Sequence, residues 1–165
     1  MAWKKFKDTL KDELTKARRI ATESFVGKPA FVDEIKELEN QKSIKESYLS
    51  KVEDSMAKGE IKEEIYNDLK RRYQSELQSI TEKLDRLYKE AKALKTTLES
   101  EIERLEAERN VASASLNELT DLYSKALMPE EDYKSQKKEL DAKLREIERG
   151  IEKRKKTLEY LSFIR

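Results

Sequence analysis

Two residue types much used as nucleophiles, acid/base groups and metal ligands are missing from this 165-residue chain, which contains no Cys and no His. Thiol nucleophiles, disulfides, thiolate or imidazole metal sites and imidazole acid/base chemistry are therefore excluded. Carboxylates remain, for example Glu101, Glu103, Glu106 and Glu108, with Arg104 between them. A carboxylate pair serves acid/base chemistry only in a pocket that shifts its pKa values. We expect a thin rod without such a pocket, and so no enzyme, no cofactor and no metal.

Two basic clusters could instead contact phosphate groups. Residues 70–72 have acidic neighbours, which argues against a continuous phosphate-binding stripe. The other cluster is a run that could contact lipid or nucleic acid, although such a run is more often simply solvated helix surface. We name it the secondary basic patch, and it consists of Lys153, Arg154, Lys155 and Lys156. Nucleic acid is not expected as a partner.

Residues 1–22 combine apolar and basic side chains at helical spacing. Seven Lys/Arg and three Asp/Glu occur there, and the apolar residues, Trp3 and Phe6 among them, fall on one face roughly 120° wide, which Glu13 interrupts. We predict an amphipathic helix that lies in the lipid interface, with aromatic anchors and cations drawn to anionic headgroups. The predicted membrane-binding residues are Trp3, Lys4, Lys5, Phe6, Lys7, Leu10, Lys11, Leu14, Lys16 and Arg18. Alternatively, this face packs on the rest of the protein.

Residues 23–30 are predicted to be a hinge after this helix. Gly27 frees the backbone, and Pro29 restricts the preceding Lys28 to extended conformations. No run of 18 or more apolar residues, the usual length of a membrane span, is present. Residues 1–22 also lack the pattern of a secretory signal. We expect a cytoplasmic protein, peripheral at the inner face of the membrane.

The chain from residue 31 onward contains the same piece twice. Residues 52–66 align with residues 119–133, 67 positions later, and the match extends to both sides. Each copy reads as a helix, a short break and a returning helix, so we divide residues 31–165 into repeats at 31–97 and 98–165. We expect helices over 31–57, from Lys62 to near Pro129, and from Pro129 onward, with Gly59 as a C-cap and Pro129 at the first helical position.

Composition agrees with long helices. Charged residues make up 43% of the chain, with three Gly and two Pro, which is typical of coiled coils. Short breaks require antiparallel helical hairpins. The predicted fold is an all-α, elongated antiparallel coiled coil. Because two helices leave apolar surface open, we expect a homodimeric rod, with higher assembly possible. The predicted dimer seam is Leu77, Ile80, Leu84, Leu87, Leu94, Leu98, Ile102 and Leu105.

Residues 62–77, beginning Lys62-Glu63-Glu64-Ile65-Tyr66, resemble the coiled-coil part of the archaeal cell-division family CdvA. That family has a similar break followed by a Tyr-containing helix start, twice, and the second copy here is residues 128–134. The resemblance covers about residues 31–160, whereas the family's N-terminal β-barrel domain is replaced by the predicted amphipathic helix. It implies a membrane-associated, self-assembling protein of archaeal type. The architecture is also similar to BAR-domain membrane-curvature proteins.

Two hypotheses of different classes follow. The first is a peripheral membrane-binding scaffold, for membrane remodelling or cell division, with anionic lipid surfaces and a second copy of itself as partners. The second is a cytosolic structural or adaptor coiled coil that binds partner proteins, in which residues 1–22 pack on the rod or on a partner.

Overall fold

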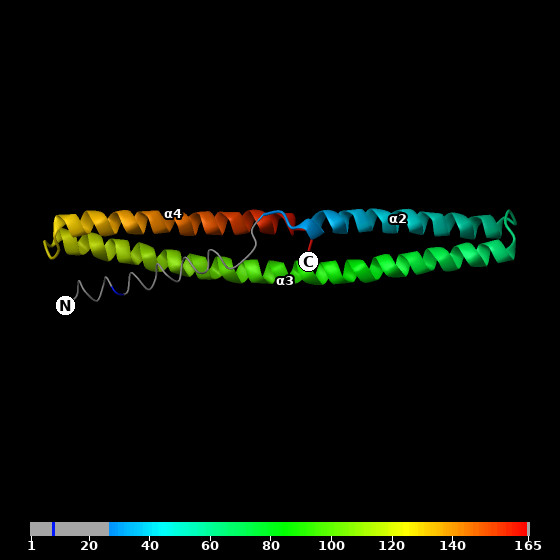
Figure 1. The fold of residues 1–165 in the computed structure, drawn as a ribbon, viewed down its shortest axis with the longest axis horizontal. Helices are drawn as coiled ribbons and strands as arrows, with labels where there is room; N and C mark the ends of the chain where they lie inside the picture. The colour runs from blue at the N-terminus through cyan, green and yellow to red at the C-terminus, as the bar shows by residue number, and fades with distance from the viewer. Residues whose placement is uncertain (1–7, 9–26, 165) are drawn as a thin grey trace. The chain divides into compact units, whose positions relative to one another are not determined.

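The structure is a computed structural model that describes residue 8 and residues 27–164. This part of the chain contains three α-helices and no strand (Figure 1). They are α2 (Ala30–Ala57), α3 (Glu63–Ser124) and α4 (Glu130–Tyr160). The predicted all-α class is confirmed. The predicted amphipathic helix at 1–22, and the predicted hinge before Gly27, lie outside the described residues.

The described residues form two compact units, and α3 contributes to both. The first helix pair consists of residues 28–94, which hold α2 and the first part of α3, together with residues 161–164. The second helix pair consists of residues 95–160, which hold the rest of α3 and α4, together with Gly27. In each pair the two helices run antiparallel (Figure 1). The predicted boundary between residues 97 and 98 separates two copies of a sequence repeat, not two compact units, and it stays a prediction.

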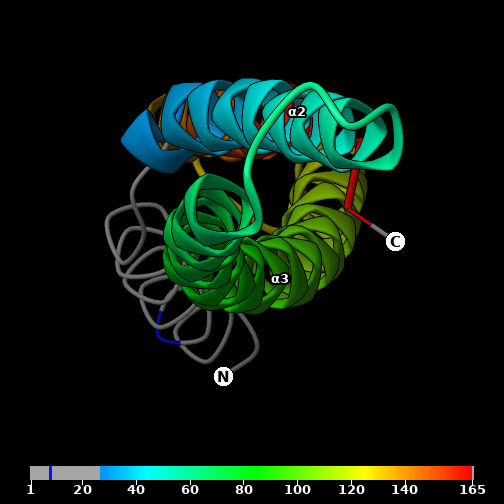
Figure 2. The same ribbon diagram turned by 90° about the vertical axis from the view of Figure 1, so that its right-hand side faces the viewer.

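The two turns that join the helices have the same backbone hydrogen bonds at positions 67 residues apart. In each turn the chain leaves the helix through a residue of positive φ, which is Gly59 (φ 70°) in the first and Ala126 (φ 56°) in the second. Figure 2 shows the first turn crossing from α2 to α3. The matching amide-to-carbonyl bonds are Lys58 to Asp54 and Lys125 to Asp121, Gly59 to Met56 and Ala126 to Tyr123, Glu60 to Ser55 and Leu127 to Leu122, and Tyr66 to Lys62 and Tyr133 to Pro129.

This bonding pattern is the Schellman motif, in which two amides beyond the helix end bond back to carbonyls of its last turn. Glycine takes positive φ without steric cost, whereas alanine does not. The next helix starts once a carbonyl accepts from an amide four residues on, and in the second turn this carbonyl belongs to Pro129. Pro129 therefore stands one residue before the first helical position predicted for it, as the N-cap of α4.

The second helix pair buries apolar side chains along its whole length. Ile102 and Leu105 of α3 pack with Ile147 and Ile151 of α4, and Leu158 is packed against them. A second cluster extends to the turn and comprises Ala112, Leu119, Met128 and Leu140, with Leu116, Leu122, Tyr133 and Leu144 at its edge. A helix pair gains most of its stability from such contacts.

The first helix pair is buried only over part of its length. Its buried apolar residues are Val32, Ile35, Leu38, Ile80, Leu84, Ala91, Leu161 and Ile164. Tyr88, close in sequence to these buried residues, stacks edge-on with Phe163, with ring centroids 6.2 Å apart. Between Lys42 and Leu77, in contrast, every side chain is half-buried or exposed. We name residues 42–77 the outer part of the first helix pair, and Ile65 within it is 48% exposed. The outer part of the first pair therefore has much less core than the equivalent part of the second.

Candidate functional site

The predicted membrane-binding residues of segment 1–22 all lie outside the described residues. The end of the predicted hinge is described. The Gly27 amide donates a hydrogen bond of 2.8 Å to the Thr157 hydroxyl of α4, and Thr157 is completely buried. Pro29 is the N-cap of α2, and Lys28 forms an ion pair with Asp33. The chain is therefore fixed at Gly27, directly before α2.

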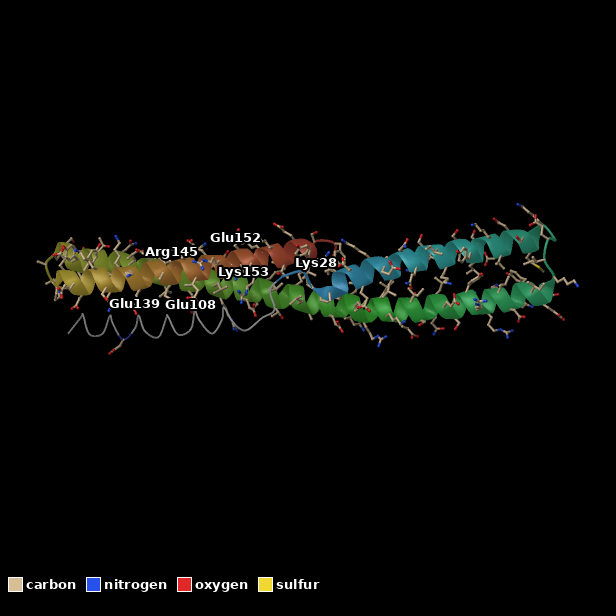
Figure 3. The ribbon with its side chains drawn as sticks, turned by 45° about the horizontal axis from the view of Figure 1, so that its top comes forward. Lys28, Glu108, Glu139, Arg145, Glu152 and Lys153 are labelled. Carbon is tan, nitrogen blue, oxygen red and sulfur yellow. The ribbon has the colours of Figure 1, made fainter. Side chains whose placement is uncertain are left out.

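The secondary basic patch does not form one exposed surface, because Arg154 points inward. Its side chain is 1% exposed, and its Nε lies 2.7 Å from Oε2 of Glu101 on α3. Lys155 and Lys156 are exposed and have acidic neighbours, Glu106 at 3.9 Å and Glu152 at 3.7 Å. Figure 3 labels Lys153 on α4, where its side chain is exposed. A run of four residues on a helix spans a full turn, so one of its members had to face the neighbouring helix.

Gly150 makes room for the buried arginine. A Cβ atom at this position would lie 3.3 Å from Nη1 of Arg154, and this same nitrogen donates a hydrogen bond of 3.1 Å to the Gly150 carbonyl oxygen. The guanidinium is thus bonded to its own helix and to the carboxylate of the opposite helix. A buried charge is tolerated only when it is paired and hydrogen-bonded in this way.

The equivalent positions of the first helix pair do not hold two opposite charges. The positions 67 residues before Glu101 and Arg154 are Glu34 and Leu87. These two residues line a pocket of about 240 Å³ together with Lys83, Arg86 and Glu90. Leu87 supplies no charge to pair with Glu34. The interior ion pair is therefore specific to the second copy of the repeat.

The predicted dimer seam is used inside the chain. Its members Ile80, Leu84, Leu98, Ile102 and Leu105 are at most 9% exposed, and its members Leu77, Leu87 and Leu94 are half-buried. Ile102 and Leu105, for example, pack on α4. Five of the eight predicted seam residues are therefore covered within the chain, whereas Leu77, Leu87 and Leu94 are covered only in part. The assignment of these residues to a seam between two copies stays a prediction.

The outer part of the first helix pair is held together by polar and aromatic contacts. Nζ of Lys45 on α2 lies 2.8 Å from Oε2 of Glu76 on α3. It also lies 5.8 and 5.7 Å from the ring centroids of Tyr48 and Tyr73, whose rings are 5.8 Å apart. Arg72 reaches the same carboxylate at 3.5 Å. The pKa of Glu76 is lowered, chiefly through hydrogen bonding to the Lys45 ammonium, against an opposing effect of burial.

Aromatic contacts also occur at the turns and beside the C-terminal residues. Tyr133 stacks on Tyr123 with ring centroids 4.2 Å apart, whereas Nζ of Lys70 lies 5.4 Å from the Tyr66 ring centroid. Tyr66 and Tyr133, which occupy equivalent positions 67 residues apart, therefore make different contacts in the two copies. Tyr88 donates a hydrogen bond of 2.9 Å to Glu39, and burial together with this bond raises the pKa of its hydroxyl.

Metal-binding clusters and membrane-spanning helices are both absent from the described part of the chain. Residues 27–164 hold no group of three or more Asp or Glu side chains placed to bind a metal ion. None of α2, α3 and α4 is long and apolar enough to cross a bilayer.

The comparisons with known proteins do not identify a family. No family model, no curated protein and no solved structure matches the chain. The similarity to the CdvA coiled coil therefore stays a prediction.

Proposed function

We propose that the chain is a peripheral membrane-binding scaffold, in which segment 1–22 docks on an anionic bilayer surface and the helix pairs form a stiff body. The observation that carries the proposal is the spacing of apolar and basic residues in segment 1–22, which predicts a helix with a basic-bordered apolar face that includes Trp3 and Phe6. Large aromatics together with flanking cations are what an interfacial helix uses to bind anionic lipid.

The contacts within the helix pairs support the role of a stiff body. Arg154 with Glu101, and Lys45 with Glu76, join opposite helices at defined positions. Polar pairs placed in a seam favour one register over its alternatives, because sliding the helices would leave the charges unpaired. In this proposal the stiff body is a dimeric antiparallel coiled-coil rod that organises or bends the bilayer from its cytoplasmic face. The similarity to CdvA and to BAR-domain proteins favours a role in membrane remodelling or cell division.

One observation favours the alternative, an adaptor that binds proteins through its helices. The hydrogen bond from Gly27 to Thr157 fixes the chain directly before α2, whereas independent docking of residues 1–22 requires freedom somewhere between Thr22 and Gly27. In the adaptor, residues 1–22 would pack on the helix pairs or on a partner protein.

Liposome co-sedimentation separates the two functions. The full chain is compared with a chain that begins at Phe31, on vesicles with and without anionic lipid. The membrane scaffold predicts that only the full chain pellets, that it does so with anionic vesicles, and that added salt weakens the binding. If both chains pellet equally, or neither does, the membrane proposal is wrong.

A further inference from the structure

The outer part of the first helix pair presents a surface that is both apolar and cationic. Ile44 and Tyr48 on α2 are 40% and 42% exposed. Lys51, whose Nζ lies 5.9 Å from the Tyr48 ring centroid, and Arg72, whose side chain is 68% exposed, extend it. We name Ile44, Tyr48, Lys51 and Arg72 the cationic face. The contacts of Lys45 with Tyr48, Tyr73 and Glu76, and of Arg72 with Glu76, connect its two helices.

The equivalent surface of the second helix pair has the opposite charge. The positions 67 residues after Ile44, Lys51 and Arg72 are Val111, Glu118 and Glu139. Val111 is 40% exposed, as Ile44 is, and both glutamates are exposed. Figure 3 labels Glu139 on α4. We name Val111, Glu118 and Glu139 the acidic face.

The two copies of the repeat have thus kept an exposed β-branched residue at one position and reversed the charge at two others. An exposed Ile or Val needs no explanation by itself. A matched apolar residue with complementary charges around it, however, is the pattern of two surfaces that bind each other. Two cationic faces would repel each other, and so would two acidic faces.

From this pattern we infer that the cationic face of one copy of the chain binds the acidic face of a second copy. In such a contact Ile44 and Val111 form the apolar centre, and Lys51 and Arg72 lie near Glu118 and Glu139. This inference rests on the proposed self-association and uses residues that are exposed on the single chain, unlike the five buried members of the predicted seam. If the contact occurs twice about a two-fold axis, with unlike faces meeting each time, it closes into a dimer.

The duplication supplies the test variants, because each replacement residue already occupies the equivalent helical position of the other pair. The variant K51E/R72E makes both faces acidic, and E118K/E139R makes both basic. Sedimentation equilibrium of the full chain should give about twice the chain mass for the wild type. Each double variant should be monomeric at the same concentration, with a dissociation constant raised by roughly a hundredfold or more, because like charges then oppose each other.

Two further samples distinguish this contact from others. The quadruple variant K51E/R72E/E118K/E139R, with the two faces exchanged, should dimerise again. An equimolar mixture of the two double variants should form the mixed dimer, since both of its contacts unite unlike faces. Circular dichroism melting confirms that each variant is folded.

The inference is overturned if the wild type is a monomer, if the double variants still dimerise, or if the quadruple variant stays monomeric. The last result would show that the attraction between these two faces does not hold the two copies together. Liposome binding is measured separately, so loss of association and loss of membrane docking are distinguishable.

Discussion

Arg154 and Glu101 form an ion pair of 2.7 Å in the interior of the second helix pair, and both side chains are at least 90% buried. Each charge depends on the other, because desolvation of an unpaired charge is costly. Replacing Arg154 by Ala should therefore destabilise the protein by about 3–5 kcal/mol. Replacing the pair by apolar residues, in the variant R154M/E101L, should cost much less. Urea unfolding followed by circular dichroism measures both, and equal losses in the two variants would contradict the assigned role.

A second prediction concerns pH and the first helix pair. Since the pKa of Glu76 is lowered in the folded protein from its ordinary value of 4.5, the carboxylate contributes stability that is fully present above that value. This contribution disappears as the pH falls through the lowered pKa. We expect the melting temperature to decrease as the solution becomes more acidic than about pH 4.5. The variant E76Q should lack this part of the decrease. A wild type and an E76Q variant with the same pH dependence would show that the ion pair has no effect on stability.

The turns provide a matched pair of substitutions. Ala126 has a φ of 56°, where a side chain is strained, and Gly59 has a φ of 70° in the equivalent turn. Replacing Ala126 by Gly should stabilise the second turn by about 1 kcal/mol, and replacing Gly59 by Ala should destabilise the first by a similar amount. Thermal unfolding of the two single variants checks both signs. The same sign in both would mean that the turns do not share the geometry described above.

The helices and turns could be predicted from the sequence, whereas the polar interior could not. Apolar periodicity and the Gly59 and Pro129 breaks locate the first residues of α2, α3 and α4 to within one residue, whereas α3 ends at Ser124 and α4 at Tyr160, each about five residues before the end expected from the sequence. Arg154 lies in a run of exposed-looking cations, and only the packing of α4 on α3 shows that it faces Glu101. The signal that could have identified it is Gly150, an otherwise unfavourable helical residue four positions earlier, on the same face. Periodicity marks the apolar stripe of α3 without telling which helix covers it, so the sequence alone does not show that α4 covers Ile102 and Leu105.

Unequal burial of the two pairs predicts unequal local stability. Between Lys42 and Leu77 every side chain is half-buried or exposed, whereas the equivalent part of the second pair contains the fully buried Leu119 and Leu140. Regions with few buried contacts open with a lower free energy. Hydrogen exchange followed by mass spectrometry should find faster exchange in residues 42–77 than in residues 109–144. Equal protection of the two regions would contradict this link between side-chain burial and local stability.

Co-sedimentation of a double variant at the two aromatic residues, W3E/F6E, with anionic liposomes tests the proposed membrane docking most directly. Burial of two large aromatic side chains is worth several kcal/mol at about 25 cal/mol per Å², while the attraction of the cations is screened by salt. If segment 1–22 docks through this face, the variant no longer pellets with the vesicles and keeps the helicity and sedimentation mass of the wild type. Unchanged pelleting would contradict membrane docking through this face, and loss of folding in the variant would show instead that residues 1–22 pack on the helix pairs.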